Sequence, residues 1–283
     1  MPTTTIGLLH PGEMGSAIGQ AIRTAGGRVL WSSEGRSART EAAAVAAGLD
    51  DVGSLASLVA ASEVIVSVCP PHAAFELARQ VAALGFRGLY VDANAVSPST
   101  VRRMAAVVQR TATFVDGGII GLPPKAAGTT RLYVSGASAA RAVALFTGSL
   151  IEAIAIEGGI GAASALKMAY AAWTKGSAAL LMAVRGLALS EGVDSALLAE
   201  WQRSLPELPD RSESVAKGNA RKAWRFVAEM EEIAAAFSSA GLPDGFHRAA
   251  GEIYRRLEGY KDAPEPPSAS AVVGQVVKPA AHS

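Results

Sequence analysis

The stretch Thr5-Ile6-Gly7-Leu8-Leu9-His10-Pro11-Gly12-Glu13-Met14-Gly15-Ser16 determines how the rest of the chain is interpreted. Its apolar first half predicts a buried strand, and a helix is expected directly behind the glycines, from about Met14 to Ala25. A strand, a glycine turn and a helix can hold a phosphate, because the turn lets the backbone approach the anion and the free N–H groups of the first helical turn face it. We therefore predict a dinucleotide site, with these cofactor-binding residues: His10, Pro11, Gly12, Glu13 and Met14.

One feature of this stretch leaves an alternative open. The dinucleotide pattern GxGxxG has a glycine where this chain has His10. An ordinary strand–helix turn would fit the shortened pattern equally well. We expect His10 to be a structural or cofactor-facing residue and not a catalyst.

Composition excludes several classes of protein. The 283 residues carry a formal net charge of +1, and no basic stripe suggests nucleic acid as a partner. Half of the residues are hydrophobic, which is enough for a large core, and no long uninterrupted apolar run suggests a membrane span. A single cysteine rules out an internal disulfide and fits a reducing compartment, so we expect a cytoplasmic protein.

The loop of residues 33–39, which follows a second predicted strand at residues 28–32, affects the choice of cofactor. In a dinucleotide fold this loop meets the adenosine ribose, where a carboxylate selects NAD and cations accommodate the 2′-phosphate of NADP. Ser33 and Arg36, with Arg39 nearby, favour NADP. Glu34 favours NAD, and a solvated polar loop without a ligand is the third possibility.

Further apolar segments alternate with helical ones. Strands are expected at residues 63–68, 89–92, 113–116, 131–135 and 153–156. This alternation predicts an α/β fold, a Rossmann-type, doubly wound and mostly parallel sheet over residues 1–160. Ligands of such sheets bind beyond the carboxyl ends of the strands, so the loops at that edge become candidate sites.

Three of these loops supply candidate residues. Cys69 and Pro70 follow one strand and are assigned to the cofactor, with Cys69 as a small apolar side chain and not a nucleophile. Asn94 and Ser97 follow the next strand and are expected to hold the nicotinamide carboxamide or the substrate. The glycine-rich segment after Asp116 is predicted to be a loop whose N–H groups bind a substrate carboxylate; its candidate residues are Gly118, Ile119, Ile120 and Gly121.

From Gly161 onward the pattern is helical. One long helix is predicted over 162–190, with further helices at 195–205, 212–239 and 245–257. Residues 161–262 are thus expected to form an all-α second domain for substrate binding and dimerisation, which begins with a long bridging helix. The proline-rich and then patternless residues 263–283 are predicted to be a disordered tail.

Lys167 is the strongest catalytic candidate. It is the only charge between Glu157 and Lys175, on a helix made of small and apolar residues. Tyr170 and Thr174 share its helical face and are candidate substrate-binding residues. A lysine that faces a nicotinamide can protonate an alkoxide as hydride reaches the carbonyl carbon, or take the proton in reverse. The alternative is an ordinary lysine at the helix surface.

Taken together, these segments resemble the β-hydroxyacid dehydrogenase family, which includes 3-hydroxyisobutyrate dehydrogenase and the front part of 6-phosphogluconate dehydrogenase. The matching motifs are the His10–Gly15 turn, Asp92–Pro98, Asp116–Gly121 and the helix that carries Lys167. Residues 191–260 are similar to a helical domain attached to phosphogluconate-dehydrogenase-like cofactor domains. The chain departs from the family pattern at the first glycine, at Ile120 in place of a serine, and one turn after Lys167, where an asparagine is expected.

The resemblance implies an NADP-dependent oxidoreductase (NAD remains possible) that acts on a small hydroxy acid, aldehyde or ketone, with Lys167 as general acid and base. The long apolar helix and the helical second domain leave much surface to cover, so a homodimer with helices exchanged between subunits is predicted. Imine reductases share the architecture but usually lack the lysine, and a non-catalytic NADP-binding sensor would need only the nucleotide site. His72 and His247 have no metal partners at ligand spacing, so no metal site is predicted.

Overall fold

The computed structural model describes residues 4–261 and 263–277. The chain divides into two compact units, Met1–Met168 and Ala169–Ser283. The division falls inside helix α7 (Ala162–Ser190), so the first two turns of this helix, with Lys167, belong to the first unit.

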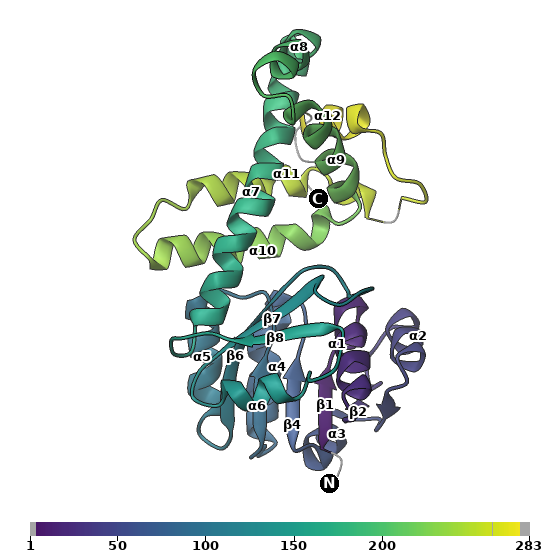
Figure 1. Ribbon diagram of the computed structural model, residues 1–283, viewed down its shortest axis with the longest axis vertical. Coiled ribbons are helices and arrows are strands. Elements are labelled where there is room, and N and C mark those ends of the chain that lie inside the picture. The colour runs from purple at the N-terminus through teal and green to yellow at the C-terminus, as the bar shows by residue number, and fades with distance from the viewer. Residues whose placement is uncertain (1–3, 262, 278–283) are drawn as a thin grey trace. The chain divides into compact units, whose positions relative to one another are not determined.

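The first unit is built on one eight-stranded sheet (Figure 1). The strand order is β3-β2-β1-β4-β5-β6-β7-β8, and every neighbouring pair is parallel except β6 and β7. The order reverses direction at β1 and β4, which is where doubly wound sheets bind dinucleotides. The predicted fold is confirmed. The strands are β1 (Thr5–Leu9), β2 (Arg28–Trp31), β3 (Asp50–Asp51), β4 (Val64–Ser67), β5 (Leu89–Asp92), β6 (Thr113–Ile120), β7 (Thr130–Ser135) and β8 (Ile151–Ala155).

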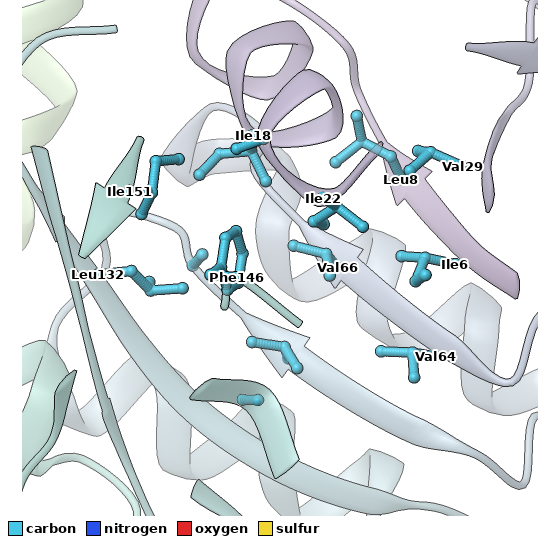
Figure 2. Close-up of a cluster of buried hydrophobic side chains, with 14 of the residues drawn as sticks. Ile6, Leu8, Ile18, Ile22, Val29, Val64, Val66, Leu132, Phe146 and Ile151 are labelled. Carbon is cyan, nitrogen blue, oxygen red and sulfur yellow. The ribbon is translucent and has the colours of Figure 1, made fainter. Parts of the chain in front are cut away.

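Helices cover both faces of the sheet and enclose two cores. One core packs α1, α2 and α6 on the sheet, and Figure 2 shows Ile18 and Ile22 of α1 near Val66 and Ile6 of the strands. The other core lies under α3, α4 and α5 and contains Tyr90 stacked on Phe114, with ring centroids 5.5 Å apart. Strands covered on both faces need the nearly continuous apolar runs found here. The helices are α1 (Glu13–Thr24), α2 (Ala38–Ala46), α3 (Leu55–Ala61), α4 (Pro71–Ala83), α5 (Pro98–Val108) and α6 (Ala139–Ala144).

Strand β6 is longer than predicted. The sequence indicated a strand that ends at Asp116 and a glycine-rich loop behind it, whereas the strand continues to Ile120 and pairs with β7 along this second half. The glycines serve close packing: a Cβ on Gly117 would lie 2.5 Å from the carbonyl oxygen of Asp92. Glycine here reflects a crowded strand and not a turn.

The second unit is helical, and α7 continues into it. The helices are α8 (Asp194–Ser204), α9 (Leu208–Ala220), α10 (Ala223–Ser239), α11 (Gly245–Arg255) and α12 (Ala269–Val277), with a short 3₁₀ helix at Glu258–Tyr260. Helices α10 and α11 lie side by side (Figure 1) and share a T-shaped contact between Phe226 and Tyr254. Lys175 forms an ion pair with Glu229 and lies over the Phe226 ring, so it has a structural role.

Two predictions about this unit were wrong. The single helix predicted over 212–239 is two helices, which break at Arg221 and Lys222. No glycine or proline marks the break, and the alanines on either side, Ala220 and Ala223, are both fully buried. The apolar periodicity is helical on both sides of this corner, so it gave no sign of the break.

The predicted disordered tail contains helix α12. Its apolar face, Ala269, Val272, Val273 and Val276, is buried, and the helix packs near α9. The Nη1 of Arg256 donates to the carbonyl oxygen of Val276 at 2.8 Å. Composition suggested disorder, but the spacing of these four residues is helical. The last part of the predicted tail, residues 278–283, lies outside the described residues.

Candidate functional site

The junction between β1 and α1 forms a tight cradle. His10 has φ +65°, and it is the only residue other than glycine with positive φ among residues 4–261 and 263–277. Its carbonyl oxygen accepts from the N–H of Gly12 at 2.8 Å, and a Cβ on Gly15 would lie 2.3 Å from that oxygen. Gly12 is the N-cap of α1 and provides no side-chain cap. The first turn of α1 therefore has donors for an anion, and the main chain at His10 leaves no room for a side chain at Gly15.

Arg36 lies close enough to His10 to affect its ionisation. Burial, followed by the charge of Arg36, lowers the pKa of His10 below its usual value of 6.5, and His72 acts in the same direction. The Nε of Arg36 is buried and has no hydrogen-bond partner in the part of the chain that the structure describes. A guanidinium with an unused donor beside the cradle fits an anionic ligand, since buried donors are normally satisfied. The residues present thus fit a dinucleotide.

The loop after β2 is held by backbone hydrogen bonds. The N–H of Ser33 donates to Oδ1 of Asp51 at 3.1 Å, and the N–H of Arg36 donates to the Ser33 carbonyl at 3.0 Å. Ser37 caps helix α2 through its hydroxyl. Arg39 falls within α2 and is exposed, whereas Arg36 is half-buried. Of the two arginines, Arg36 is the one that the loop turns toward the cradle.

Asn94 joins the ends of β4 and β5. Its Oδ1 accepts from the N–H of Cys69 at 2.6 Å, and its Nδ2 donates to Oγ of Ser67 at 3.0 Å and to Oδ1 of Asp92 at 2.5 Å. The residue is 2% exposed. Its amide is thus bonded within the protein and positions the Cys69–Pro70 loop, so direct contact with a ligand stays a prediction.

Cys69 and Ser97 are also buried. Burial raises the pKa of the Cys69 thiol to about 12, so the thiol is protonated, which fits its predicted role as a small apolar side chain. Ser97 is the N-cap of α5, where its hydroxyl accepts from the N–H of Thr100 at 3.2 Å. Contact between Ser97 and a substrate is likewise still a prediction.

Two aspartates face each other across β5 and β6. Asp92 and Asp116 are register partners, and both are fully buried. Burial, and then the charge of Asp116, raise the pKa of Asp92 well above its usual value of 3.8, which favours the neutral carboxyl. Its Oδ2 has no hydrogen-bond partner among the described residues.

Asp116 binds the beginning of α7. Its Oδ2 accepts from the N–H groups of Gly161 at 2.8 Å and Ser164 at 3.1 Å, and its Oδ1 accepts from the Ser164 hydroxyl at 2.6 Å. The Ser135 hydroxyl lies 3.0 Å from Oδ2 and accepts from the N–H of Ala163 at 3.1 Å. A carboxylate at a helix N-terminus accepts hydrogen bonds from the free N–H groups and also interacts favourably with the positive end of the helix dipole.

Lys167 follows Ser164 by three residues on the same helical face and is half-buried. A Cβ on Gly118 would lie 2.8 Å from the Cβ of Lys167, so the lysine stem lies directly against β6. Asp116 is in register with Asp92, the last residue of β5, and Asp92 is in register with Ser67, the last residue of β4. Gly118 lies two residues beyond Asp116 along β6. Lys167 therefore lies past the carboxyl ends of β4 and β5, at the edge that carries the cradle.

The predicted carboxylate nest after Asp116 is corrected by the structure. A nest needs successive N–H groups that converge, whereas in a strand they point to alternate sides. Gly118, Ile119 and Ile120 belong to β6, and the two isoleucines are 7% and 4% exposed. Gly121, with φ +122°, is the first residue past the strand. Side-chain or strand-edge contact of these residues with a substrate stays a prediction.

Tyr170 and Thr174 lie on α7 within the second unit. Tyr170 is 48% exposed, and the Thr174 hydroxyl donates to the Tyr170 carbonyl at 3.1 Å. Their predicted substrate contacts stay predictions.

The sequence did not single out Asp116, Asp92 or Ser135 as members of a site. An acidic residue at the end of each of two buried strands is the signal that was available, because a buried carboxylate requires partners. The partners themselves, 45 and 48 residues farther along the chain, could not be read from local pattern. Among the described residues, no group of histidine, cysteine and acidic side chains could hold a metal ion, and no helix is long and apolar enough to cross a bilayer.

Comparison with known proteins identifies the family. Residues 5–154 match the family described as the NAD binding domain of 6-phosphogluconate dehydrogenase, and residues 188–257 match a domain of unknown function, DUF1932. The chain belongs to this NAD-binding family. The predicted resemblance to the β-hydroxyacid dehydrogenases, a family of NAD(P)-dependent oxidoreductases with a helical second part, is thereby confirmed.

Three relatives illustrate the likeness. A 28.5 kDa protein from the 7S RNA 5′ region of Methanothermus fervidus is 30% identical over 194 residues, which cover 68% of this chain and 74% of that protein. The crystal structure of a conserved hypothetical protein from Sinorhizobium meliloti has a TM-score of 0.71 at 23% identity and covers 98% of this chain and 96% of its own. The structure of the 3-hydroxyisobutyrate dehydrogenase of Mycobacterium tuberculosis has a TM-score of 0.68 at 18% identity. The match covers 96% of this chain and 98% of that protein.

Proposed function

We propose that this protein is an NADP-dependent oxidoreductase that interconverts a small aldehyde or ketone and the matching alcohol or hydroxy acid, with Lys167 as general acid and base. The supporting observation is the place of Lys167: its stem lies against Gly118 of β6, past the carboxyl ends of β4 and β5. The cradle at His10–Gly15 opens at the same edge of the sheet. A proton donor and a nucleotide site at one edge are the two parts that carbonyl reduction requires.

The reduced nicotinamide, when bound, supplies the hydride. The backbone at Gly12–Gly15 would hold the pyrophosphate at the uncapped start of α1, and Arg36 would pair with a phosphate. The Lys167 ammonium then donates a proton to the carbonyl oxygen as negative charge develops there, and in the oxidative direction the neutral amine accepts it. A positioned acid of this kind accelerates proton transfer by about 10²- to 10⁴-fold.

The test is Lys167→Met, which keeps the stem and removes the amine. We expect kcat to fall by about 10²-fold or more, while the Kd for NADPH stays within a few-fold of wild type. Lys217→Met, at an exposed lysine of α9, is the matched control and should leave both values unchanged. Weaker NADPH binding with unchanged turnover would contradict the role of Lys167.

The preference for NADP rests on Arg36. If its guanidinium pairs with the 2′-phosphate, Arg36→Ala should raise the Kd for NADPH by about 10- to 100-fold, equivalent to one charge-assisted hydrogen-bond pair, and change the Kd for NADH little. Arg110→Ala, at an exposed arginine after α5, is the control. An equal loss for both cofactors would place Arg36 at the pyrophosphate and remove the argument for NADP.

A second candidate is an imine reductase on the same fold. It is favoured by Ile120, a buried apolar side chain where the family places a serine, since a carboxylate substrate would gain no hydroxyl partner there. Lys167 favours carbonyl chemistry. Measured turnover of small aldehydes, hydroxy acids and cyclic imines with NADPH separates the two: reduction of imines alone would replace the first proposal by the second.

The predicted homodimer is supported by one face of α7 in the second unit. Tyr170, Trp173, Leu180 and Leu187 are 48%, 68%, 48% and 66% exposed. Their spacing of three and then seven residues is that of a coiled-coil seam, and such a patch is rarely left open to water. Sedimentation at micromolar concentration should show a dimer, and Leu180→Glu should yield a monomer. A wild-type monomer would contradict this proposal.

A further inference from the structure

The polar cluster of Asp116, Ser135 and Ser164 lies next to the proposed acid. The hydrogen bonds of Asp116 go to Gly161, Ser164 and Ser135, and three of the four involve groups of the first turn of α7 or the residue before it. All of these groups are buried. The cluster therefore has a role that the proposed reaction does not yet explain.

Strand β6 contacts α7 at two points on one face. Side chains two residues apart in a strand point to the same side, so Asp116 and the missing side chain of Gly118 face α7 together. Asp116 binds residues 161 and 164 of the helix. Gly118 has no side chain at a place where a Cβ would lie 2.8 Å from both the Ala163 carbonyl oxygen and the Lys167 Cβ.

These two contacts constrain different motions of the helix. The carboxylate holds the first N–H groups of α7 at a fixed distance from β6, and its bond to the Ser164 hydroxyl at 2.6 Å resists rotation about the helix axis. The bare backbone at Gly118 sets how closely the helix can approach. Because Ser164 and Lys167 share a helical face, rotation or withdrawal of α7 would move the lysine stem directly.

We propose that Asp116 is a positioning residue for the reaction: through Ser164 and the first turn of α7, and together with the close approach at Gly118, it fixes where the Lys167 amine lies. This inference rests on the proposed role of Lys167. An acid displaced by about 1 Å can cost about 10²-fold in rate, so the anchor would be seen in turnover more than in cofactor affinity.

The experiment is a double-mutant cycle that pairs Asp116→Asn with Lys167→Met. Asp116→Asn alone should lower kcat by about 10- to 100-fold and leave the Kd for NADPH within a few-fold. In the Lys167→Met background it should lower kcat no further, because the displaced group is already absent. Independent, multiplicative losses in the double variant would overturn the proposal.

Two milder variants keep the test decisive if Asp116→Asn does not fold. Ser164→Ala removes one hydrogen bond of the anchor, and Gly118→Ala pushes on the Lys167 stem; each should lower kcat by about 3- to 30-fold, again only when Lys167 is present. Ser212→Ala is the matched control, because it removes a buried hydroxyl that bonds Arg185 at 2.9 Å in the second unit. Ser212→Ala should lower the Tm by about as much as Ser164→Ala and Gly118→Ala do, and it should leave kcat unchanged.

A second readout separates this inference from the proposed function. Reductive ¹³C-methylation labels the lysine amines, and the NMR resonance of Lys167 should shift in Asp116→Asn and Ser164→Ala, while that of Lys217 stays in place. If the Lys167 resonance moves but Lys167→Met retains full turnover, the positioning holds and the proposed acid role fails. If the resonance does not move in either variant, the positioning role is wrong.

Discussion

Two helices of the first unit begin at the same edge of the sheet, and their N-termini are treated in opposite ways. Helix α1 begins at Gly12, which makes no side-chain cap hydrogen bond, and Glu13 is the acidic residue of its first turn. Helix α7 begins against Asp116, whose carboxylate accepts from the N–H of Gly161, just before the helix, and from the N–H and hydroxyl of Ser164. One terminus has no side-chain cap, and the other is capped by the Asp116 carboxylate.

The difference shows how the same physical feature can serve binding or positioning. Both termini present unpaired donors and the positive end of a helix dipole. At the start of α1, Gly12 provides no side-chain cap for the N–H groups of the first turn that follow it. Where the chain supplies a buried carboxylate, the start of the helix is anchored to β6, and Lys167 lies on the next turn. The predictions below test each side of this contrast.

The largest effect is expected at the open terminus. Gly15→Ala would place a Cβ 2.3 Å from the His10 carbonyl oxygen, which is main chain and can move only with the cradle. We expect a loss of about 3 kcal/mol in the free energy of unfolding, as for severe overpacking, and loss of NADPH binding. Urea unfolding and a cofactor titration would measure both.

The control for this prediction is Gly218→Ala in helix α9. No atom lies within 4 Å of a Cβ at Gly218, so the helix gains propensity without a clash. The change should raise the free energy of unfolding by up to about 1 kcal/mol. Equal behaviour of the two alanine variants would show that the cradle is not as tightly packed as described.

The next effect is the dependence of protein stability on pH that Asp92 causes. Asp92 has a folded pKa raised well above 3.8 by burial and by the charge of Asp116, so its contribution to stability is complete below pH of about 4 and is lost as pH rises through the folded pKa. Asp92→Asn removes this loss. The free energy of unfolding of the variant, relative to that of wild type, should therefore rise by about 1.4 kcal/mol for each pH unit above pH 4. The rise should stop at the folded pKa of Asp92.

Urea unfolding of wild type and Asp92→Asn between pH 4 and pH 8 would measure this gain. Asn can keep the acceptor for Asn94 that Oδ1 of Asp92 provides. Exposed Asp210→Asn is the control and should give parallel curves. A stability difference that does not change with pH would mean that Asp92 is ionised in the folded protein.

The smallest effect is expected at His10. Its φ of +65° costs a non-glycine residue about 1 kcal/mol, so His10→Gly should stabilise the protein by up to about that amount, whereas His10→Val should destabilise it. Thermal unfolding of both variants compares them directly. Greater stability of the valine variant would show that the cradle backbone is not strained.

Local pattern was sufficient for most of the first unit. The apolar run before His10, the glycines behind it and the alternation of strands and helices predicted the sheet, because each strand is buried on both faces and each helix has one apolar stripe. The isolated charge of Lys167 on an otherwise apolar helix, and then the family resemblance, indicated the catalytic candidate. Pattern failed where glycine has two meanings: Gly117 and Gly118 indicated a loop, but they mark a strand packed closely on Asp92 and Ala163.

The rest of the site depends on contacts that no local pattern contains. Asp116 reaches Ser164 across 48 residues, and its partnership arises only when β6, β7 and α7 come together. Asn94 was expected to face a ligand, yet its amide is bonded to Ser67, Asp92 and Cys69. A polar residue at the working edge of a sheet can thus serve the scaffold as well as the substrate, and sequence alone does not separate these roles.

The acid role of Lys167 is tested most directly by chemical rescue. Lys167→Ala removes the amine and leaves room where the side chain was, so kcat for carbonyl reduction should fall by about 10²-fold or more. Added methylamine should restore turnover in proportion to its concentration, and the recovered rate should depend on the basicity of the amine used. Turnover that is unchanged in Lys167→Ala, or that is lost and does not respond to any primary amine, would contradict the proposed acid.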